Sequence, residues 1–319
     1  MSIVHPLNLA IKPFHVNHST MPNVNTKHIL FWLRADKGPL SGEELSQKLG
    51  ISRVAVWKQI QGLLTAGYGI QVGRKGYHLI QDEGVLPPEF PEIESDVNYW
   101  PQLDSTMEKA KEMALNGARH GTLVLAGRQT QGRNLSSLPW SSPPGGLYLT
   151  MILRPPLKLA QASVLPLVLG TAMAKELSKC TGEAIQWLWP SGWYSRGIKL
   201  GGILPQVMGT PYRLDWVNLG IGFSLLPGTL TPQFPSRRDL VKLTRKIMID
   251  WCNQPDFTSS QWLEGSPLQG GMLIVKPDEG TEWMGKFHGY TPEGNLVILK
   301  NQELKVLIYG QNQIQISGE

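Results

Sequence analysis

The sequence has little cysteine and no long apolar run. Cys180 and Cys252 are the only cysteines among 319 residues, and neither lies in a CxxC or Cys/His pattern. A disulfide framework and a structural zinc site are therefore not expected, and any metal would have to be held by oxygen ligands. No apolar stretch approaches the roughly 18 residues that span a bilayer, and the N-terminus lacks the features of a signal peptide. We expect a cytoplasmic protein of two or three domains, because a typical domain has roughly 100 to 200 residues.

Changes in hydrophobic periodicity and clusters of proline, glycine and acidic residues indicate the domain boundaries. Residues 1–22 show no clean period, so we expect a disordered extension or a mis-assigned start there. Three prolines and a cluster of acidic residues in QDEGVLPPEFPEIESD predict a linker over 83–96. A weaker break, EGSPLQGG, separates the last region. The predicted domains are therefore 23–82, 97–265 and 266–319.

Basic charge is concentrated in the first of these domains. Between Asn23 and Ile80 there are eight Lys and Arg residues against three Asp and Glu residues, which is a net charge of +5 and equals the formal charge of the whole chain. The remainder of the chain is therefore close to neutral. A small basic domain is typical of a nucleic-acid-binding module.

The same region has the pattern of a winged helix-turn-helix. Ser41 and Ser52 are placed to cap two short helices, and Gly50 ends the first of them. Apolar residues of the second helix recur at helical spacing, which turns its polar face outward, toward a major groove. VGRKGY then predicts a hairpin turn with two cations. A solvated charged face is the simpler interpretation of each part, but the combination favours DNA binding through Ser52, Arg53, Trp57, Lys58, Arg74 and Lys75.

This N-terminal region resembles the DNA-binding domain of BirA-type biotin–protein ligases and biotin repressors. The resemblance rests on LSQKLGISRVAVWKQIQGL and GRKGYHLI. It implies a double-stranded DNA operator as partner, and paired half-sites would imply a homodimer.

The central region alternates strands with amphipathic helices, an α+β pattern. In LDSTMEKAKEMA, Ser105 caps a helix, and this turn is either only a cap or a place that presents hydroxyl and N–H groups to a small ligand. RQTQGR, WPSG, RGIKLGGIL and VNLGIGFS follow or form further strands, and glycines in them allow close backbone approach.

In order and spacing these segments resemble the catalytic domain of biotin–protein ligases. That family joins biotin to ATP as biotinyl-AMP and passes biotin to a lysine of a carrier protein. The resemblance implies biotin contacts at Ser105, Thr106, Gln129, Gly132, Arg133, Lys199, Gly202 and Gly220, with Lys199 and Arg133 also catalytic. A buried lysine there would stabilise charge that develops on the reacting oxygens; the alternative is an ordinary solvated lysine.

Two segments that would bind the nucleotide in this family depart from the family pattern. GRGRRGR reads here GRNLSSL, with Leu135 and Leu138 in place of arginines, and KWPND reads LWPSG, with Leu188 in place of lysine and Gly192 in place of aspartate. Cations that would meet triphosphate, and a carboxylate for Mg²⁺, are missing. The leucines predict a dry, uncharged lid over the ligand.

Two functions therefore remain open. One is a DNA-binding transcription regulator that binds biotin or a related acid as effector. The other is an active bifunctional biotin–[carboxyl-carrier-protein] ligase and repressor, which would also use ATP and Mg²⁺ and dock a biotin carboxyl carrier protein. The predicted fold is α+β: a winged helix-turn-helix, a central class II synthetase-like biotin ligase domain, and an SH3-like β-barrel in which His288 is an ordinary strand residue.

Overall fold

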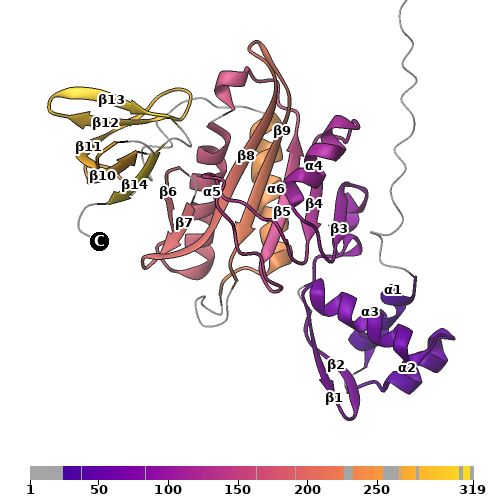
Figure 1. Ribbon diagram of the computed structural model, residues 1–319. Helices are drawn as coiled ribbons and strands as arrows, with labels where there is room; N and C mark the ends of the chain where they lie inside the picture. The colour runs from indigo at the N-terminus through magenta and orange to yellow at the C-terminus, as the bar shows by residue number, and fades with distance from the viewer. Residues whose placement is uncertain are drawn as a thin grey trace, which may run out of the picture.

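The computed structural model describes residues 24–316, apart from positions 37, 83, 163, 191, 226–232, 254–265, 267, 278–279 and 309–311. Three units follow one another along this part of the chain: a helical unit with a hairpin, a seven-stranded sheet with helices, and a five-stranded sheet (Figure 1). The predicted α+β class is confirmed. The expected extension over residues 1–22 and part of the weaker break lie outside the described residues.

The first unit is a winged helix-turn-helix. Its elements are α1 (Val24–Ala35), α2 (Gly42–Leu49), α3 (Arg53–Thr65) and the antiparallel hairpin of β1 (Tyr68–Gly73) and β2 (Gly76–Asp82).

Local sequence explains how these helices begin and end. The Ser41 hydroxyl accepts the N–H of Glu44 at 3.0 Å, and the Ser52 hydroxyl accepts the N–H of Ala55 at 3.2 Å, so both predicted N-caps form. Gly50 ends α2 in the left-handed region, with φ of 63°. Each cap satisfies backbone groups that a helix end leaves without a partner.

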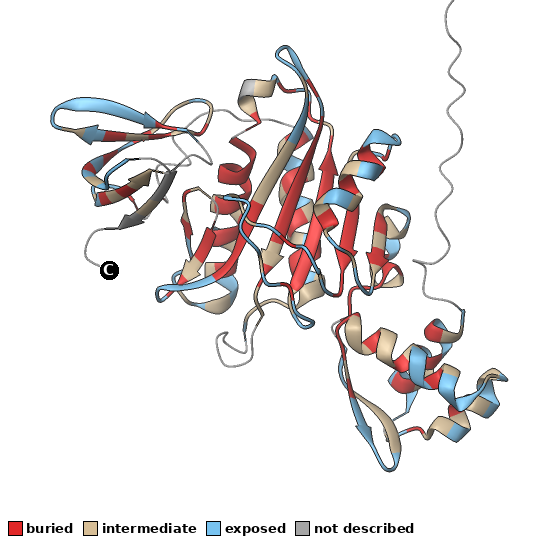
Figure 2. Cartoon of the chain, viewed as in Figure 1, coloured by how far each residue is buried: buried red, intermediate tan, exposed pale blue. Residues whose placement is uncertain are grey.

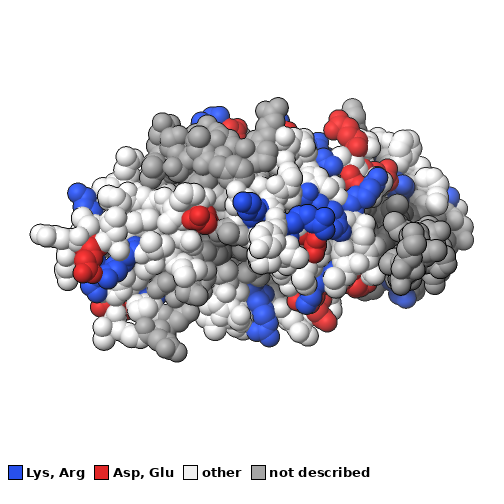
Figure 3. All heavy atoms as spheres, turned by 90° about the horizontal axis from the view of Figure 1, so that it is seen from above, with Lys and Arg blue, Asp and Glu red and all other residues white. Residues whose placement is uncertain are grey.

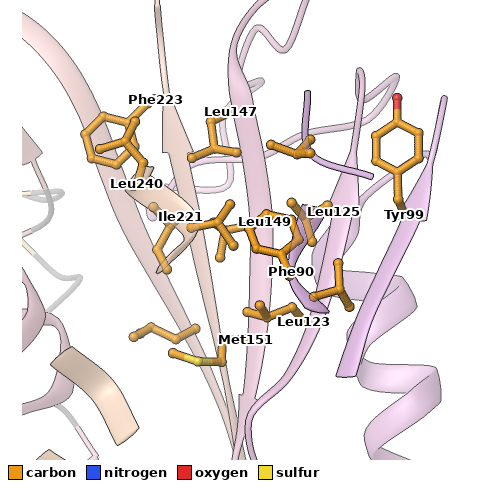
Figure 4. Close-up of a cluster of buried hydrophobic side chains, with 14 of the residues drawn as sticks. Phe90, Tyr99, Leu123, Leu125, Leu147, Leu149, Met151, Ile221, Phe223 and Leu240 are labelled. Atoms are coloured by element: carbon orange, nitrogen blue, oxygen red, sulfur yellow. The ribbon is translucent and has the colours of Figure 1, made fainter. Parts of the chain in front are cut away.

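The segment after the hairpin connects the first two units but is folded and packed. It forms the 3-10 helices η1 (Pro87–Glu89) and η2 (Pro91–Asp96), each with proline at its start, where no backbone N–H is needed. Phe90 is 2% exposed and lies among buried side chains of the central sheet, including Leu125 and Leu149 (Figure 4). One apolar cluster therefore continues from the helical unit into the central unit.

The central unit is a seven-stranded sheet in the order β3-β4-β5-β9-β8-β7-β6. Its strands are β3 (Val97–Trp100), β4 (Thr122–Ala126), β5 (Leu147–Leu153), β6 (Gln186–Leu188), β7 (Gly192–Ser195), β8 (Ile198–Thr210) and β9 (Arg213–Phe223). Its helices are α4 (Thr106–Leu115), η3 (Leu159–Gln161), α5 (Val164–Thr181) and α6 (Arg237–Asn253).

Helix α4 packs on one face of this sheet, and α5 and α6 pack on the other. The middle strands β5 and β9 are almost wholly buried (Figure 2), as expected for strands covered on both faces. Pairing of β8 with β9 sets Gly202 opposite Gly222 and Leu204 opposite Gly220, which brings several glycines to one patch of the sheet surface.

The last unit is an antiparallel sheet in the order β13-β12-β11-β10-β14. Its strands are β10 (Met272–Pro277), β11 (Trp283–Tyr290), β12 (Leu296–Lys300), β13 (Glu303–Leu307) and β14 (Asn312–Ile316). Trp189 of the central unit is buried in the core of this sheet and donates its indole N–H to the carbonyl of Gly294 at 3.2 Å. His288 is exposed on β11, as an ordinary strand residue would be.

Candidate ligand pocket and nucleic-acid interface

A pocket of about 490 Å³ opens between the start of α4, the segment 129–140, and strands β8 and β9. Its volume is within the range of small-molecule sites. The predicted ligand residues that line it are Ser105, Thr106, Gln129, Arg133, Lys199, Gly202 and Gly220. Gly132, the remaining predicted ligand residue, is buried and does not line the pocket.

The floor of the pocket is a network of neutral hydrogen-bonding groups. Gln129 Oε1 accepts the backbone N–H of Thr106 at 2.8 Å and its hydroxyl at 3.0 Å. Gln129 Nε2 donates to the Ser142 hydroxyl at 2.9 Å, and the Thr150 hydroxyl, which is buried, donates to Thr106 at 2.9 Å. These bonds fix the side chains in place before any ligand arrives. Nε2 of Gln129 keeps a second proton, which a ligand acceptor can take.

Ser105 begins α4 at the edge of the same floor. Its hydroxyl oxygen accepts the N–H of Met107 at 3.2 Å. Ser105 is therefore a helix cap, which was one of the two interpretations of this turn. The hydroxyl proton takes no part in that bond, because the oxygen is the acceptor. One residue can therefore cap the helix and donate to a ligand.

Lys199 stands at the other end of the pocket. Its Nζ lies 5.4 Å from the centre of the Trp140 ring and 5.8 Å from that of Tyr194, within the range of cation–π contact. No ion pair to Lys199 occurs among the described residues. The expectation of a buried lysine is wrong for the residue as a whole, which is exposed. Partial desolvation of its ammonium group nevertheless lowers the pKa of Lys199 below its ordinary value.

Two glycines of β9 shape the wall between these ends. A Cβ at Gly220 would lie 2.5 Å from the sulfur of Met107, and one at Gly222 would lie 2.9 Å from Nε1 of Trp140. Glycine at these positions lets α4 and Trp140 approach the sheet. Trp140 was not among the predicted site residues, because a single tryptophan after a loop carries no periodic signal.

The glycine-rich loop is folded on itself. The backbone N–H of Leu138 donates to the Asn134 side chain at 3.0 Å, and the N–H of Asn134 donates to the Leu138 carbonyl at 2.9 Å. Arg133 Nη1 donates to the carbonyl of Ser137 at 2.8 Å, which directs the guanidinium toward its own loop. Leu135 lines the pocket, whereas Leu138 is 57% exposed and does not line it, so only the first leucine is placed where the expected apolar lid requires it.

Gly192 and Leu188, which differ from the family's nucleotide-binding pattern, contact residues that leave no room for the family's side chains or lie away from the pocket. A Cβ at Gly192 would lie 2.6 Å from the Tyr194 ring and 3.2 Å from Lys199 Cε, so Tyr194 fills the direction an aspartate side chain would take. Leu188 packs against the core of the C-terminal sheet and does not line the pocket. Gly192 offers no side-chain oxygen ligand, and no group of three or more His, Cys, Asp and Glu residues suited to a metal occurs among the described residues. Position 192 therefore supplies no carboxylate for Mg²⁺, and the carboxylates that line the pocket are those of Asp104 and Glu108.

A second hollow, of about 430 Å³, lies between α3 and the β1–β2 hairpin. Of the predicted DNA contacts, Arg53, Trp57 and Arg74 line it. Lys58 and Lys75 are exposed nearby without lining it, and the Ser52 side chain is engaged in its cap bond.

The hairpin is held at this position by backbone pairing. Leu40 and Tyr77 exchange hydrogen bonds of 2.9 and 2.8 Å. Gly76 has a φ of 122°, and a Cβ there would lie 2.1 Å from the Leu40 carbonyl oxygen, so this contact requires glycine. The second glycine of GRKGY thus fixes the wing against the helices.

Charge elsewhere is mixed. Viewed from the side of the β8–β9 turn, away from the β1–β2 hairpin, basic and acidic groups are interspersed on a largely uncharged surface (Figure 3). None of the helices in the described part of the chain is long and apolar enough to cross a membrane.

The fold and the two sites define a class of protein in which a winged helix-turn-helix is joined to an α+β domain that contains a pocket. Residues 25–78 match the family described as HTH domain, and residues 99–223 match the biotin/lipoate A/B protein ligase family. Over these two regions the chain is therefore similar to the bifunctional ligase/repressor BirA proteins.

Individual relatives agree with that placement. The bifunctional ligase/repressor BirA of Bacillus subtilis is 36% identical over 197 residues, covering 58% of this chain and 60% of the relative. The protein of the same name from Escherichia coli is 32% identical over 190 residues, covering 58% and 59%. The matches therefore span about 60% of these relatives. A biotin protein ligase from Aquifex aeolicus, solved with biotin and ATP, shares the fold with a TM-score of 0.56 at 21% identity, over 69% of this chain and 99% of that one.

Proposed function

We propose that the chain is a DNA-binding transcription regulator whose ligase-like domain binds biotin, or a related small carboxylic acid, as effector. Double-stranded DNA would bind at the cationic surface of α3 and the hairpin. The acid would bind in the pocket between α4 and β9.

One observation carries the proposal for the ligand. The pocket has neutral hydrogen-bonding groups at Thr106 and Gln129, and a lysine at the other end, Lys199, that forms no ion pair among the described residues. A ligand with a neutral polar head and a carboxylate satisfies both ends at once. Biotin has a ureido ring, a short apolar chain and a carboxylate. The family that residues 99–223 match is described by biotin and lipoate, and the Aquifex aeolicus ligase was solved with biotin, which supports this choice.

The second candidate is the active ligase, and the presence of Lys199 in the pocket favours it. Against it stand the Tyr194 ring beside Gly192, the packing of Leu188 against the C-terminal sheet, and an Arg133 directed to its own loop. Adenylation gathers a carboxylate and a triphosphate, whose mutual repulsion needs opposing cations. We therefore place effector binding first and ligation with ATP and Mg²⁺ second.

Calorimetric titration of the full chain with biotin tests the effector site. Saturable binding is expected, and Lys199→Ala should weaken it roughly 10- to 100-fold, since a hydrogen bond to a charged group contributes about 1.5 to 3 kcal/mol. Lys242→Ala is the matched control, because Lys242 is an exposed lysine of α6 that does not line the pocket. Absence of heat with biotin, lipoate and octanoate would refute the proposal.

Biotin-dependent exchange of pyrophosphate into ATP separates the two candidates. Near-background exchange together with biotin binding agrees with an effector site. Exchange at a rate typical of enzymes would make the ligase the better assignment.

A further inference from the structure

The hollow between α3 and the hairpin is partly apolar, which its cations do not explain. Val54 is 65% exposed, Trp57 is 50% exposed and Val72 of β1 is 54% exposed, and all three line the same hollow. Arg53 and Arg74 line it as well. A surface that only attracted phosphate would have no use for three solvent-exposed apolar side chains in one place.

Val54 has a particular position on its helix. It is the second residue of α3 and, at 3.6 residues per turn, lies nearly opposite the buried Val56 and Leu63. Its side chain therefore projects from the middle of the outward face, at the N-terminal end of the helix. In helix-turn-helix complexes this end of the recognition helix meets base edges.

Only one base-pair group in the major groove is apolar, and that is the C5-methyl of thymine. We propose that Val54 reads a thymine by contact with this methyl group, while Arg53 and Arg74 face the phosphates and polar edges beside it. This inference rests on the proposed DNA-binding function. It adds a specificity residue that carries no charge and that the charge pattern of the sequence does not reveal.

The neighbouring charges agree with this arrangement. Arg53 lies 3.9 Å from Glu43, and the two side chains are 72% and 60% exposed. Such an exposed pair contributes little, so Arg53 is free to turn toward DNA. A single carboxylate in the hollow leaves its balance cationic, as a duplex requires.

The test begins with selection of a duplex from a random pool by the full chain. Each thymine of the selected site is then replaced by deoxyuridine, which removes only the methyl group, and binding is measured by fluorescence anisotropy. At one thymine per half-site the replacement should weaken wild-type binding about 4-fold, equivalent to about 0.8 kcal/mol for one buried methyl group. In Val54→Ala the two duplexes should bind about equally well. Val24 is an equally exposed valine on α1, and Val24→Ala should keep the wild-type difference.

The other outcomes of this experiment distinguish failure of the Val54 proposal from failure of the proposed DNA binding. Sensitivity to deoxyuridine that persists in Val54→Ala, or a selected site without thymine, overturns the Val54 inference while DNA binding stands. Failure to select any sequence removes the DNA-binding function and this inference with it. Val54→Thr, which keeps one methyl group and the exposed position, should give an intermediate sensitivity and guards against an effect of truncation alone.

Discussion

Glu89 Oε2 lies 3.0 Å from Nη2 of Arg238, which ties the segment between the helical and central units to the first turn of α6. The other carboxylate oxygen lies 2.8 Å from Nη2 of Arg34 and accepts the Tyr68 hydroxyl at 2.5 Å. The Glu89 side chain is only 9% exposed. One acidic group thus joins α1, the hairpin, η1 and α6.

Glu89→Gln should therefore destabilise the protein. The variant keeps the size of the side chain but removes the charge that two arginines share, at an expected loss of about 1 to 3 kcal/mol in the free energy of unfolding. Denaturant unfolding measures the change. Glu92→Gln is the control, because Glu92 is exposed in η2 and forms no ion pair among the described residues. Equal stability of both variants would contradict the structural role of Glu89.

Biotin affinity should depend on the protonation of Lys199. Desolvation lowers the pKa of this lysine below its ordinary value of 10.5, so the group becomes neutral at a lower pH than a free lysine does. A carboxylate binds the protonated form better. Affinity should then be constant near neutral pH and fall as the pH rises through the lowered pKa. Titration calorimetry over roughly pH 7 to 10 measures this, and Lys199→Met should give a weaker but flat profile.

A side chain at Gly192 should be costly because of Tyr194. The Cβ of Gly192→Ala would lie 2.6 Å from the Tyr194 ring, so about 1 to 3 kcal/mol of stability should be lost. In a Tyr194→Ala background the same change should cost clearly less, which a double-mutant cycle measures. Gly62→Ala, at a helical position with no atom within 4 Å of the new Cβ, should be neutral or stabilising. An additive cycle would argue against this contact.

The Tyr194 ring should also limit any attempt to restore the family's nucleotide-binding residues. Leu135→Arg, Leu188→Lys and Gly192→Asp together should raise pyrophosphate exchange little while Tyr194 occupies the space beside residue 192. Adding Tyr194→Ala should raise exchange further. If the three changes alone give full exchange, Tyr194 is not the obstacle.

The hairpin turn should contribute phosphate contacts. Arg74 and Lys75 are both exposed at its tip, and replacing both with alanine should reduce the slope of log affinity against log salt by about 1.8, near 0.9 per phosphate. Anisotropy titrations over a salt series measure the slope. Lys242→Ala with Lys246→Ala removes two exposed cations from α6 and should leave it unchanged. An unchanged slope in the Arg74 and Lys75 variant would exclude the wing from phosphate binding.

Local signals in the sequence predicted the parts of this fold that depend on nearby residues. Ser41, Ser52 and Gly50 bound two helices by contacts within a few positions, and the structure places them as expected. The alternation of strands and helices also sufficed for the α+β class. Residues brought to the pocket from α4, the loop and β8 could be named together only through resemblance to a family, because their spacing in sequence does not encode their meeting.

The misplaced residues depend on distant contacts. Leu188 was assigned to the nucleotide side, yet it packs against the C-terminal sheet, which lies about a hundred positions later in the chain. Phe90 stood in a proline-rich stretch that predicted a linker, and only the central sheet gives it a buried position. Patterns of period and composition carry no information about such partners.

The buried position of Phe90 bears on how far the chain is modular. The apolar core of the helical unit continues past this residue into the central sheet, so opening of one unit is expected to expose part of the other's interior. We therefore expect the two units, which have separate sheets, to unfold together. If the helical unit binds DNA as proposed, moving it to another protein would also require the surface that receives Phe90.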